Sequence, residues 1–366
     1  MSDTDFVPRW ASPPGDTIKD ALHEQCMEGR TLAEALELSQ NEFEALLGGD
    51  IPLTIKLCER LSSKIGGSVE FWMTRDGQYQ ADRSRVLADA WVQRMPVHDM
   101  KTFGWIQSDT DNWLSQIDNC LRFFDVVSPD AWQAEHTALL EQTRFRSSKI
   151  LESDEFAVAA WLRQCEVELS NIPCAQWDRD AFEALLPQLL PLTRLGDPRH
   201  FLSELQARCA EVGVAVGVVR APRGCPVSGA ARRLPSGQPS IAMSGRHRAD
   251  DHLWFTFFHE SAHLLFHGTD ALYLDEIELD SDPSPSSEEA EADRFAGTML
   301  VPPEYEARLA GARRSPLELR KIAGEIGVSL GIVIGHLQHR GLVGYNTRLN
   351  RLKSRYKWNG PTLERA

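Results

Sequence analysis

The sequence contains no long apolar run and no recognisable export signal. Its longest mostly apolar stretch, Leu253 to Phe258, is far shorter than the roughly 20 residues of a membrane-spanning helix. The amino terminus begins Met-Ser-Asp-Thr-Asp and has no basic segment followed by an apolar one. We therefore expect a protein with neither a secretory signal nor a membrane partner.

Cysteine is scarce and scattered. The seven cysteines occur singly, and no two are spaced as a Cys-x-x-Cys pair. An odd, dispersed set in a chain without an expected export signal indicates reduced thiols and excludes a disulfide framework. This usage predicts a cytoplasmic protein.

An excess of positive charge is also missing. The chain has 39 Lys and Arg against 53 Asp and Glu, which gives a net charge of −14 at pH 7. Because nucleic acid repels an acidic protein, any DNA contact requires a local basic patch. One candidate is a C-terminal run of five basic residues within ten positions, Arg348, Arg351, Lys353, Arg355 and Lys357. The competing interpretation is an ordinary solvated charged surface.

What remains is the composition of a globular protein, with 366 residues, 42% hydrophobic and 25% charged. Apolar periodicity predicts helices over most of the chain, and alternation between Gly213 and Met243 predicts two or three short strands. The predicted fold class is α+β and mainly helical. The predicted regions are a helix-turn-helix bundle over 12–95, a helical middle over 96–205, a small-sheet domain over 206–345 and a basic tail over 346–366.

Short helices with separate N-caps are expected in the first region. Asp16, Thr31, Ser39 and Thr54 each precede an apolar-periodic run. The turn between the second and third of these helices, near Glu37 to Ser39, is short enough for a helix-turn-helix.

The clearest chemical motif is His259-Glu260-Ser-Ala-His263. Residues four apart lie on one face of a helix, so the two imidazoles can hold one metal ion. Glu260 follows the first histidine, where its carboxylate can act as general base on a water without ligating the metal. This arrangement predicts metal-assisted hydrolysis of a peptide bond.

The predicted helix around the motif, from about Asp251 to His267, is apolar on nearly all sides. Such a helix belongs in a core, where unpaired histidines and a glutamate are costly to bury. The alternative is a pair of core histidines satisfied by hydrogen bonds. His267 continues the four-residue spacing but lies roughly 12 Å along the axis from His259, which is too far for a third ligand. We expect it to be a helix C-terminal residue favoured by the dipole.

A third ligand is expected from the predicted helix that starts at Ser287. Of its three early glutamates, Glu289 is favoured because Asp293 follows four residues later on the same face. Asp293 can accept the second ring N–H of a ligating histidine. The alternative role for Glu289 is a capping box with Ser286. Two imidazoles and a carboxylate accept several divalent ions, so manganese stays open beside zinc.

These residues resemble the ImmA/IrrE family of metallopeptidases. The resemblance covers Phe257 to His267 and Glu289 to Pro302, with further likeness in Gly327-Val-Ser and Leu337 to Gly341. It implies a zinc-dependent endopeptidase of gluzincin type, with His259, His263 and Glu289 as ligands and Glu260 as general base. Members of the family commonly cleave a cognate DNA-binding repressor in stress or mobile-element control.

The first region resembles the XRE helix-turn-helix domain of HigA-type antitoxins, in Pro13 to Asp16, Leu32 to Leu36 and Gly67 to Trp72. Its expected recognition helix carries Gln40 and Asn41, which can contact adenine. The same helix carries Glu42 and Glu44, which phosphates would repel. Docking a protein partner and forming a homodimer are therefore alternative uses of this domain.

Two functions follow as hypotheses. The first is a zinc endopeptidase that cleaves a repressor, a toxin partner or itself, for which Ser108 to Asn112 is a candidate cleavage segment. The second is a DNA-binding repressor or antitoxin whose zinc domain is a sensor or scaffold. In either case single-stranded DNA can act as an effector on the basic tail, through Arg351, Lys353 and Arg355.

Overall fold

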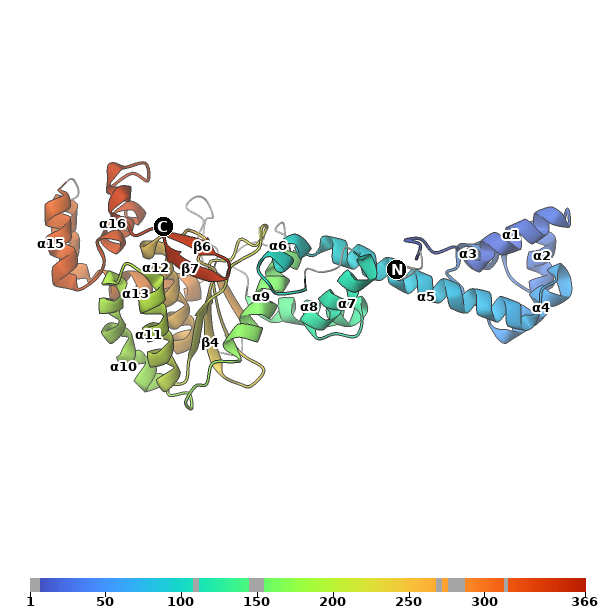
Figure 1. The fold of residues 1–366 in the computed structure, drawn as a ribbon, viewed down its shortest axis with the longest axis horizontal. Coiled ribbons are helices and arrows are strands. Elements are labelled where there is room, and N and C mark those ends of the chain that lie inside the picture. The colour runs from blue at the N-terminus through green and yellow to red at the C-terminus, as the bar shows by residue number, and fades with distance from the viewer. Residues whose placement is uncertain (1–6, 108–111, 145–154, 268–271, 276–286, 313–314) are drawn as a thin grey trace, which may run out of the picture. The chain divides into compact units, whose positions relative to one another are not determined.

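The computed structural model describes residues 7–107, 112–144, 155–267, 272–275, 287–312 and 315–366. The chain forms two compact units (Figure 1). The first comprises Met1–Arg94 and Thr110–Asp118, and the second comprises Met95–Asp109 and Asn119–Ala366. The described residues are mainly helical with small sheets, which agrees with the predicted α+β class. Ser108 to Asp111 of the candidate cleavage segment lie outside the described residues, as does 276–286.

The first unit is built from short helices and one long one. They are α1 (Pro14–Glu24), α2 (Gly29–Leu36), α3 (Gln40–Gly48), α4 (Ile55–Ile65) and α5 (Val69–Arg94). Ser39 caps α3 in a capping box with Glu42, and Thr54 caps α4, as predicted. The short turn before α3 is closed by Glu37, which has a positive φ of 60°.

Two of the predicted caps are wrong. α1 starts at Pro14, with Pro13 as the N-cap residue, so Asp16 lies inside the first turn. The fixed φ of proline suits the first helical position and starts this helix earlier than the capping pattern indicates. α2 starts at Gly29, two residues before Thr31, and has no side-chain cap.

The second unit contains a mixed five-stranded sheet. Its strands are β1 (Thr143–Arg144), β2 (Ala215–Val218), β3 (Gly229–Arg233), β4 (Pro239–Met243) and β5 (Leu272–Asp275). Their order is β1-β5-β3-β4-β2; β3 is antiparallel to both neighbours, while β2 and β4 are parallel. The strands predicted between Gly213 and Met243 are therefore present as β2, β3 and β4, and β5 was not predicted.

The remaining helices belong to the second unit, except that the first half of α7 is part of the first unit. Those before the metal motif are α6 (Val97–Thr102), α7 (Trp113–Phe124), α8 (Pro129–Gln142), α9 (Glu155–Leu169), α10 (Arg179–Leu189), the 3-10 helix η2 (Leu190–Arg194) and α11 (Pro198–Glu211). Those from the motif onward are α12 (Asp250–Ala262), the π-helical η3 (His263–His267), α13 (Ser287–Leu300), η4 (Pro303–Tyr305), α14 (Glu306–Ala312), α15 (Pro316–Ile326), α16 (Leu330–His339) and η5 (Arg348–Leu352).

Alternate residues of the strands face two different cores. Val216, Ala231 and Ile241 pack with α10, α11 and α12 on one side of the sheet. The neighbouring Ala215, Ala230 and Ala242 pack with α9 on the other side. Because β4 is covered on both faces, all five of its residues are buried, including the polar Ser240. The predicted middle region therefore supplies α9 as an outer layer of the same sheet.

The expected basic tail is part of this core. Residues 346–366 form η5 and a hairpin of β6 (Tyr356–Asn359) and β7 (Thr362–Arg365). Tyr356 and Leu363 are buried in the cluster that contains the apolar residues of α12. The hairpin resists prediction because each strand is only four residues long.

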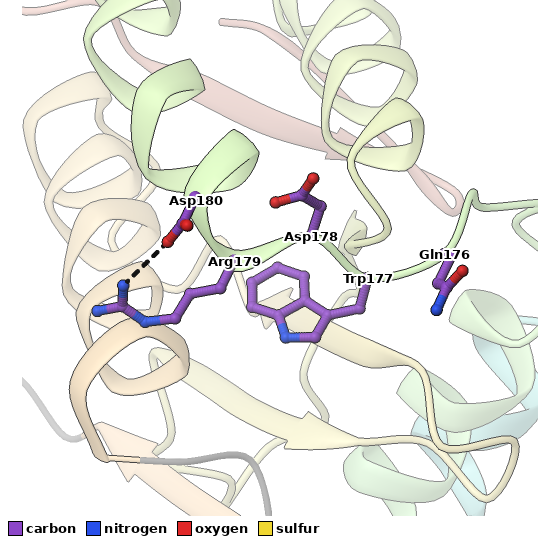
Figure 2. Close-up of a pocket in the computed structure, with 5 residues that line it drawn as sticks. All are labelled: Gln176, Trp177, Asp178, Arg179 and Asp180. Atoms are coloured by element: carbon purple, nitrogen blue, oxygen red, sulfur yellow. Dashed lines mark ion pairs between the residues drawn. The ribbon is translucent and has the colours of Figure 1, made fainter.

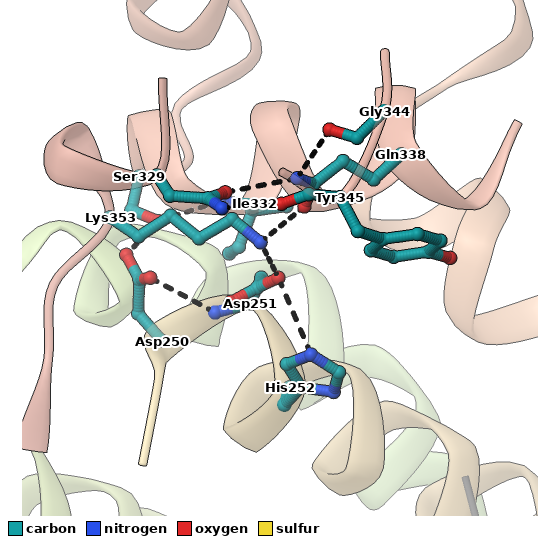
Figure 3. A network of polar contacts seen from close by, with 10 residues as sticks. Asp250, Asp251, His252, Ser329, Ile332, Gln338, Gly344, Tyr345 and Lys353 are labelled. Atoms are coloured by element: carbon teal, nitrogen blue, oxygen red, sulfur yellow. Dashed lines mark hydrogen bonds and ion pairs between the residues drawn. The ribbon is translucent and has the colours of Figure 1, made fainter. Parts of the chain in front are cut away.

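Lys353 corrects one DNA-binding prediction. Its ammonium group is buried, forms an ion pair with Asp251 and donates to Gln338 Oε1 at 2.6 Å (Figure 3). A buried, paired lysine is not available to a phosphate. Arg351 and Arg355 are exposed, and their contact with DNA stays a prediction. Among the described residues, no helix is both long enough and apolar enough to span a bilayer.

Candidate metal centre

The centre is held by α12, whose surroundings follow from its composition. Phe257, Phe258 and Trp254 are almost completely buried, and so are the polar residues that follow. A helix that is apolar on all sides needs cover on all sides. The sheet supplies one side through β3 and β4, and α13 and α16 supply the others.

α13 places its acidic side chains against this helix. Glu289 is 3% exposed, and Asp293 lies four residues later on the same face. Glu288, the first alternative ligand, is not in the group of converging donors. The competing capping role of Glu289 involves Ser286, which lies outside the described residues.

Donor atoms of three side chains converge at one point. His259 Nε2 lies 3.1 Å from His263 Nε2 and 3.1 Å from Glu289 Oε2, while His263 Nε2 lies 3.5 Å from Glu289 Oε1. Ligands about 2.0–2.1 Å from a tetrahedral metal ion are about 3.3 Å apart. The observed separations therefore fit three ligands of one small divalent ion.

The protonation of the imidazoles supports the same conclusion. His259 Nδ1 lies 3.0 Å from Asp293 Oδ1 and donates its proton to this carboxylate. The Nε2 atom of a neutral ring then carries a lone pair, and it faces His263 Nε2 at 3.1 Å. This lone pair, His263 Nε2 and the Glu289 carboxylate lie around one point, so the donor set fits a metal ion.

The surroundings shift the pKa values of His263 and Glu289 in the direction that metal binding requires. Burial is the main cause that lowers the pKa of His263, so its ring is neutral. Burial acts in the opposite sense on Glu289, but the adjacent side chains of His259 and His263 outweigh it and hold the pKa of this carboxyl below its ordinary value. Neutral imidazoles and an ionised carboxylate are the forms that bind a metal.

Glu260, the predicted general base, is completely buried beside β3. A Cβ atom added to Gly229 would lie 2.5 Å from Glu260 Oε1 and 2.5 Å from Thr256 Cγ2. The absence of a side chain at Gly229 therefore gives the Glu260 carboxylate its space. Sequence reasoning missed Gly229, because a glycine at the start of a strand carries no signal of what lies opposite.

The comparison with known families agrees with this geometry. Residues 218–337 match the model of the IrrE N-terminal-like domain, peptidase family M78. This family consists of zinc metallopeptidases. The match supports a metallopeptidase-like domain in the IrrE-like segment, residues 218–337. No curated protein and no solved structure matches the chain.

All residues of the converging group lie in the IrrE-like segment. Two further side chains meet there that sequence reasoning did not assign to the centre. His267 Nδ1 lies 2.9 Å from His263 Nδ1, and His267 Nε2 lies 3.0 Å from Glu291 Oε2. The continued four-residue spacing of His267 was the signal for this contact. His267 is also the last residue of the helix, as predicted.

A pocket at the start of α10 lies outside the group of converging donors. It is lined by Gln176, Trp177, Asp178, Arg179 and Asp180 (Figure 2). Arg179 also donates from Nε to the Leu265 carbonyl at 3.0 Å, and so holds the π-helical turn that follows His263.

The predicted DNA-contacting residues of the first unit lie on α3. Gln40 donates to Glu44 Oε1 at 2.9 Å, and Asn41 is exposed. Glu42 is engaged in the capping box with Ser39. One of the two glutamates that would repel phosphates therefore stabilises the helix itself.

Proposed function

We propose that this protein is a zinc-dependent endopeptidase that cleaves a regulatory protein. The observation that carries the proposal is the convergence of His259, His263 and Glu289 donor atoms within 4.8 Å of one another. The group is buried next to Glu260 and lies inside the segment that matches a metallopeptidase family.

His259, His263 and Glu289 would hold the metal, with Asp293 orienting His259. Zinc supplies a Lewis acid that polarises a carbonyl group and makes water more acidic. A carboxylate oxygen of Glu260 takes a proton from the attacking water and returns it to the nitrogen of the leaving amine. The buried surroundings keep this carboxylate away from competing bulk water. Manganese can replace zinc on the same donor set.

The proposed substrate is a cognate DNA-binding repressor, a toxin partner, or the chain itself, in a stress, defence or toxin-antitoxin setting. The tight turn between α2 and α3 in the first unit supports a helix-turn-helix that recruits DNA or a protein partner. Cleavage would then control gene expression. The cytoplasmic location and a homodimer belong to the same proposal, and single-stranded DNA is a candidate effector.

A second function is favoured by the exposed amide of Asn41 in the first turn of α3. Here the protein is a DNA-binding repressor or antitoxin, and its metal centre is a sensor or scaffold. Under this alternative, Glu260→Gln leaves every activity intact, whereas substitution of Gln40 or Asn41 abolishes operator binding.

The deciding experiment compares the wild type with Glu260→Gln. Each is incubated with zinc or manganese, with and without single-stranded DNA, together with any small repressor or toxin encoded beside the gene. Intact mass follows the products. Fragments from the wild type alone establish the peptidase and identify the cleaved bond. Uncut spectra in all conditions, with metal bound, favour the regulator with a silent metal site.

A further inference from the structure

The second ring nitrogen of His263 is engaged differently from that of His259. His259 meets a carboxylate directly through Asp293. His263 instead meets a third imidazole, with Nδ1 atoms 2.9 Å apart, and this imidazole meets Glu291 at 3.0 Å. The His267 side chain is 5% exposed, so this chain of contacts is shielded from solvent up to the exposed Glu291.

Hydrogen-bond chemistry fixes the protons along this chain. If His263 Nε2 offers its lone pair to a metal, its proton lies on Nδ1 and is donated to His267 Nδ1. His267 then carries its own proton on Nε2, which it donates to the Glu291 carboxylate. Each donor in this series of hydrogen bonds meets an acceptor, and the series ends at the negatively charged Glu291 carboxylate.

The backbone supports this arrangement. Residues His263–His267 form a π-helical turn, a rare form that occurs often at functional sites. Arg179 holds this turn by donating to the Leu265 carbonyl. Glu291 projects from a different side of α13 than Glu289 and Asp293, so it reaches His267 and leaves the ligand positions free.

We infer that His267 and Glu291 are positioning residues for the metal ligand His263. They orient its ring, fix its tautomer and raise its basicity, as Asp293 does for His259. This inference rests on the proposed metal centre, and it concerns metal affinity independently of peptide cleavage.

The test measures zinc affinity of the full-length chain by competition with a chelator. His267→Leu removes both contacts, whereas His267→Asn keeps an acceptor near the position of Nδ1. Glu291→Ala removes the terminal carboxylate, and Glu291→Gln keeps an oxygen acceptor without charge. Glu304→Gln is the matched control, because Glu304 is an exposed glutamate on η4.

We expect His267→Leu and Glu291→Ala to weaken zinc affinity about 10- to 100-fold. His267→Asn and Glu291→Gln should recover part of this loss, and Glu304→Gln should match the wild type. The double variant His267→Leu/Glu291→Ala should lose little more than the worse single variant, because both act through one chain. Long-range nitrogen–proton NMR of the zinc-loaded wild type should show His267 protonated at Nε2.

Equal zinc affinity in the wild type and His267→Leu overturns the inference, as does an asparagine variant no better than the leucine variant. Both results leave the proposed peptidase intact. A wild type that binds no zinc at all instead refutes the proposed metal centre. Circular dichroism of the metal-free variants separates loss of affinity from loss of fold.

Discussion

At the scale of single residues, the candidate metal centre depends on side chains that two helices, α12 and α13, place within reach of one another. The histidine spacing and the position of Glu289 relative to Asp293 follow from helix geometry alone, and the structure brings these side chains together. Gly229 and His267 were not predicted, because their roles depend on what the fold places opposite them. A one-dimensional pattern contains no information about such partners.

Gly229→Ala should separate catalysis from metal binding. The added methyl group would lie 2.5 Å from Glu260 Oε1 and must displace this carboxylate, while the three donor atoms are untouched. We expect kcat for peptide cleavage to fall at least about tenfold, since a displaced general base loses much of its contribution. Zinc affinity should change less than about threefold.

The matched control for this variant is Gly324→Ala on α15. No heavy atom lies within 4 Å of a Cβ added there, so activity should be unchanged. Wild-type turnover by Gly229→Ala would contradict the positioning argument.

Asp250 makes the stability of the second unit depend on pH. Burial and the neighbouring Asp251 raise the pKa of Asp250 from its ordinary value of 3.8 to about 6, although Ser329 donates to its carboxylate. The folded state therefore binds the Asp250 proton more tightly than the unfolded state. Stability contributed by this proton is present below pH 4 and is lost as the pH rises to about 6.

Asp250→Asn should remove this dependence. Relative to the wild type, the variant should gain roughly 1–3 kcal/mol of stability between pH 4 and pH 7. Urea denaturation of both proteins across this pH range provides the measurement. Asp180→Asn, on the exposed start of α10, should follow the wild-type curve. Parallel curves for wild type and Asp250→Asn would show that the prediction is wrong.

At the scale of elements, the sequence predicts the start of a helix correctly where a side chain caps it. Ser39 and Thr54 cap their helices as predicted. The starts of α1 and α2 were wrong, because a proline and an uncapped glycine begin them. β5, β6 and β7 are four residues each, too short for alternation to stand out from chance.

Lys353 ties the C-terminal segment to the start of α12. Its ammonium group pairs with Asp251 inside the core and contacts Gln338 (Figure 3). Lys353→Met should cost about 3–5 kcal/mol, because it leaves a buried carboxylate without its counter-charge. Chemical denaturation followed by tryptophan fluorescence measures this loss.

The double variant Lys353→Met/Asp251→Leu should regain much of the lost stability, since it removes both charges. Lys357→Met, at an exposed position on β6, is the control and should stay within about 0.5 kcal/mol of the wild type. A cost below about 1 kcal/mol for Lys353→Met alone would refute the view that this ion pair supports the fold.

At the scale of the whole molecule, composition and periodicity were sufficient for the mainly helical α+β class. Composition and periodicity did not predict which segments pack together in the second unit. α9 comes from the predicted middle region and packs on the sheet, and Tyr356 comes from the predicted tail and packs in the core that contains α12. Contacts between such distant segments depend on tertiary packing, which local patterns do not encode.

Removing residues after Thr347 should therefore abolish zinc binding, because Tyr356 and Leu363 would leave the core around α12. Substituting the exposed Arg351, Arg355 and Lys357 by Gln should instead preserve zinc binding and thermal stability. The affinity for single-stranded DNA is then measured on the variant that carries these three Gln substitutions. Zinc binding by the truncated chain would contradict this account of the core.

The distribution of the core along the chain has a consequence for folding kinetics. The core of the first unit is formed by helices that are close together in the sequence. One core of the second unit instead contains residues as far apart as Phe182 and Leu363. Contacts between distant residues require the closure of long loops and slow the rate of folding. A refolding chain should thus recover its helical N-terminal unit before the distant segments that bury α12 have packed against it. Under the proposed function, a newly made protein would then bind its partner before it is able to cleave one.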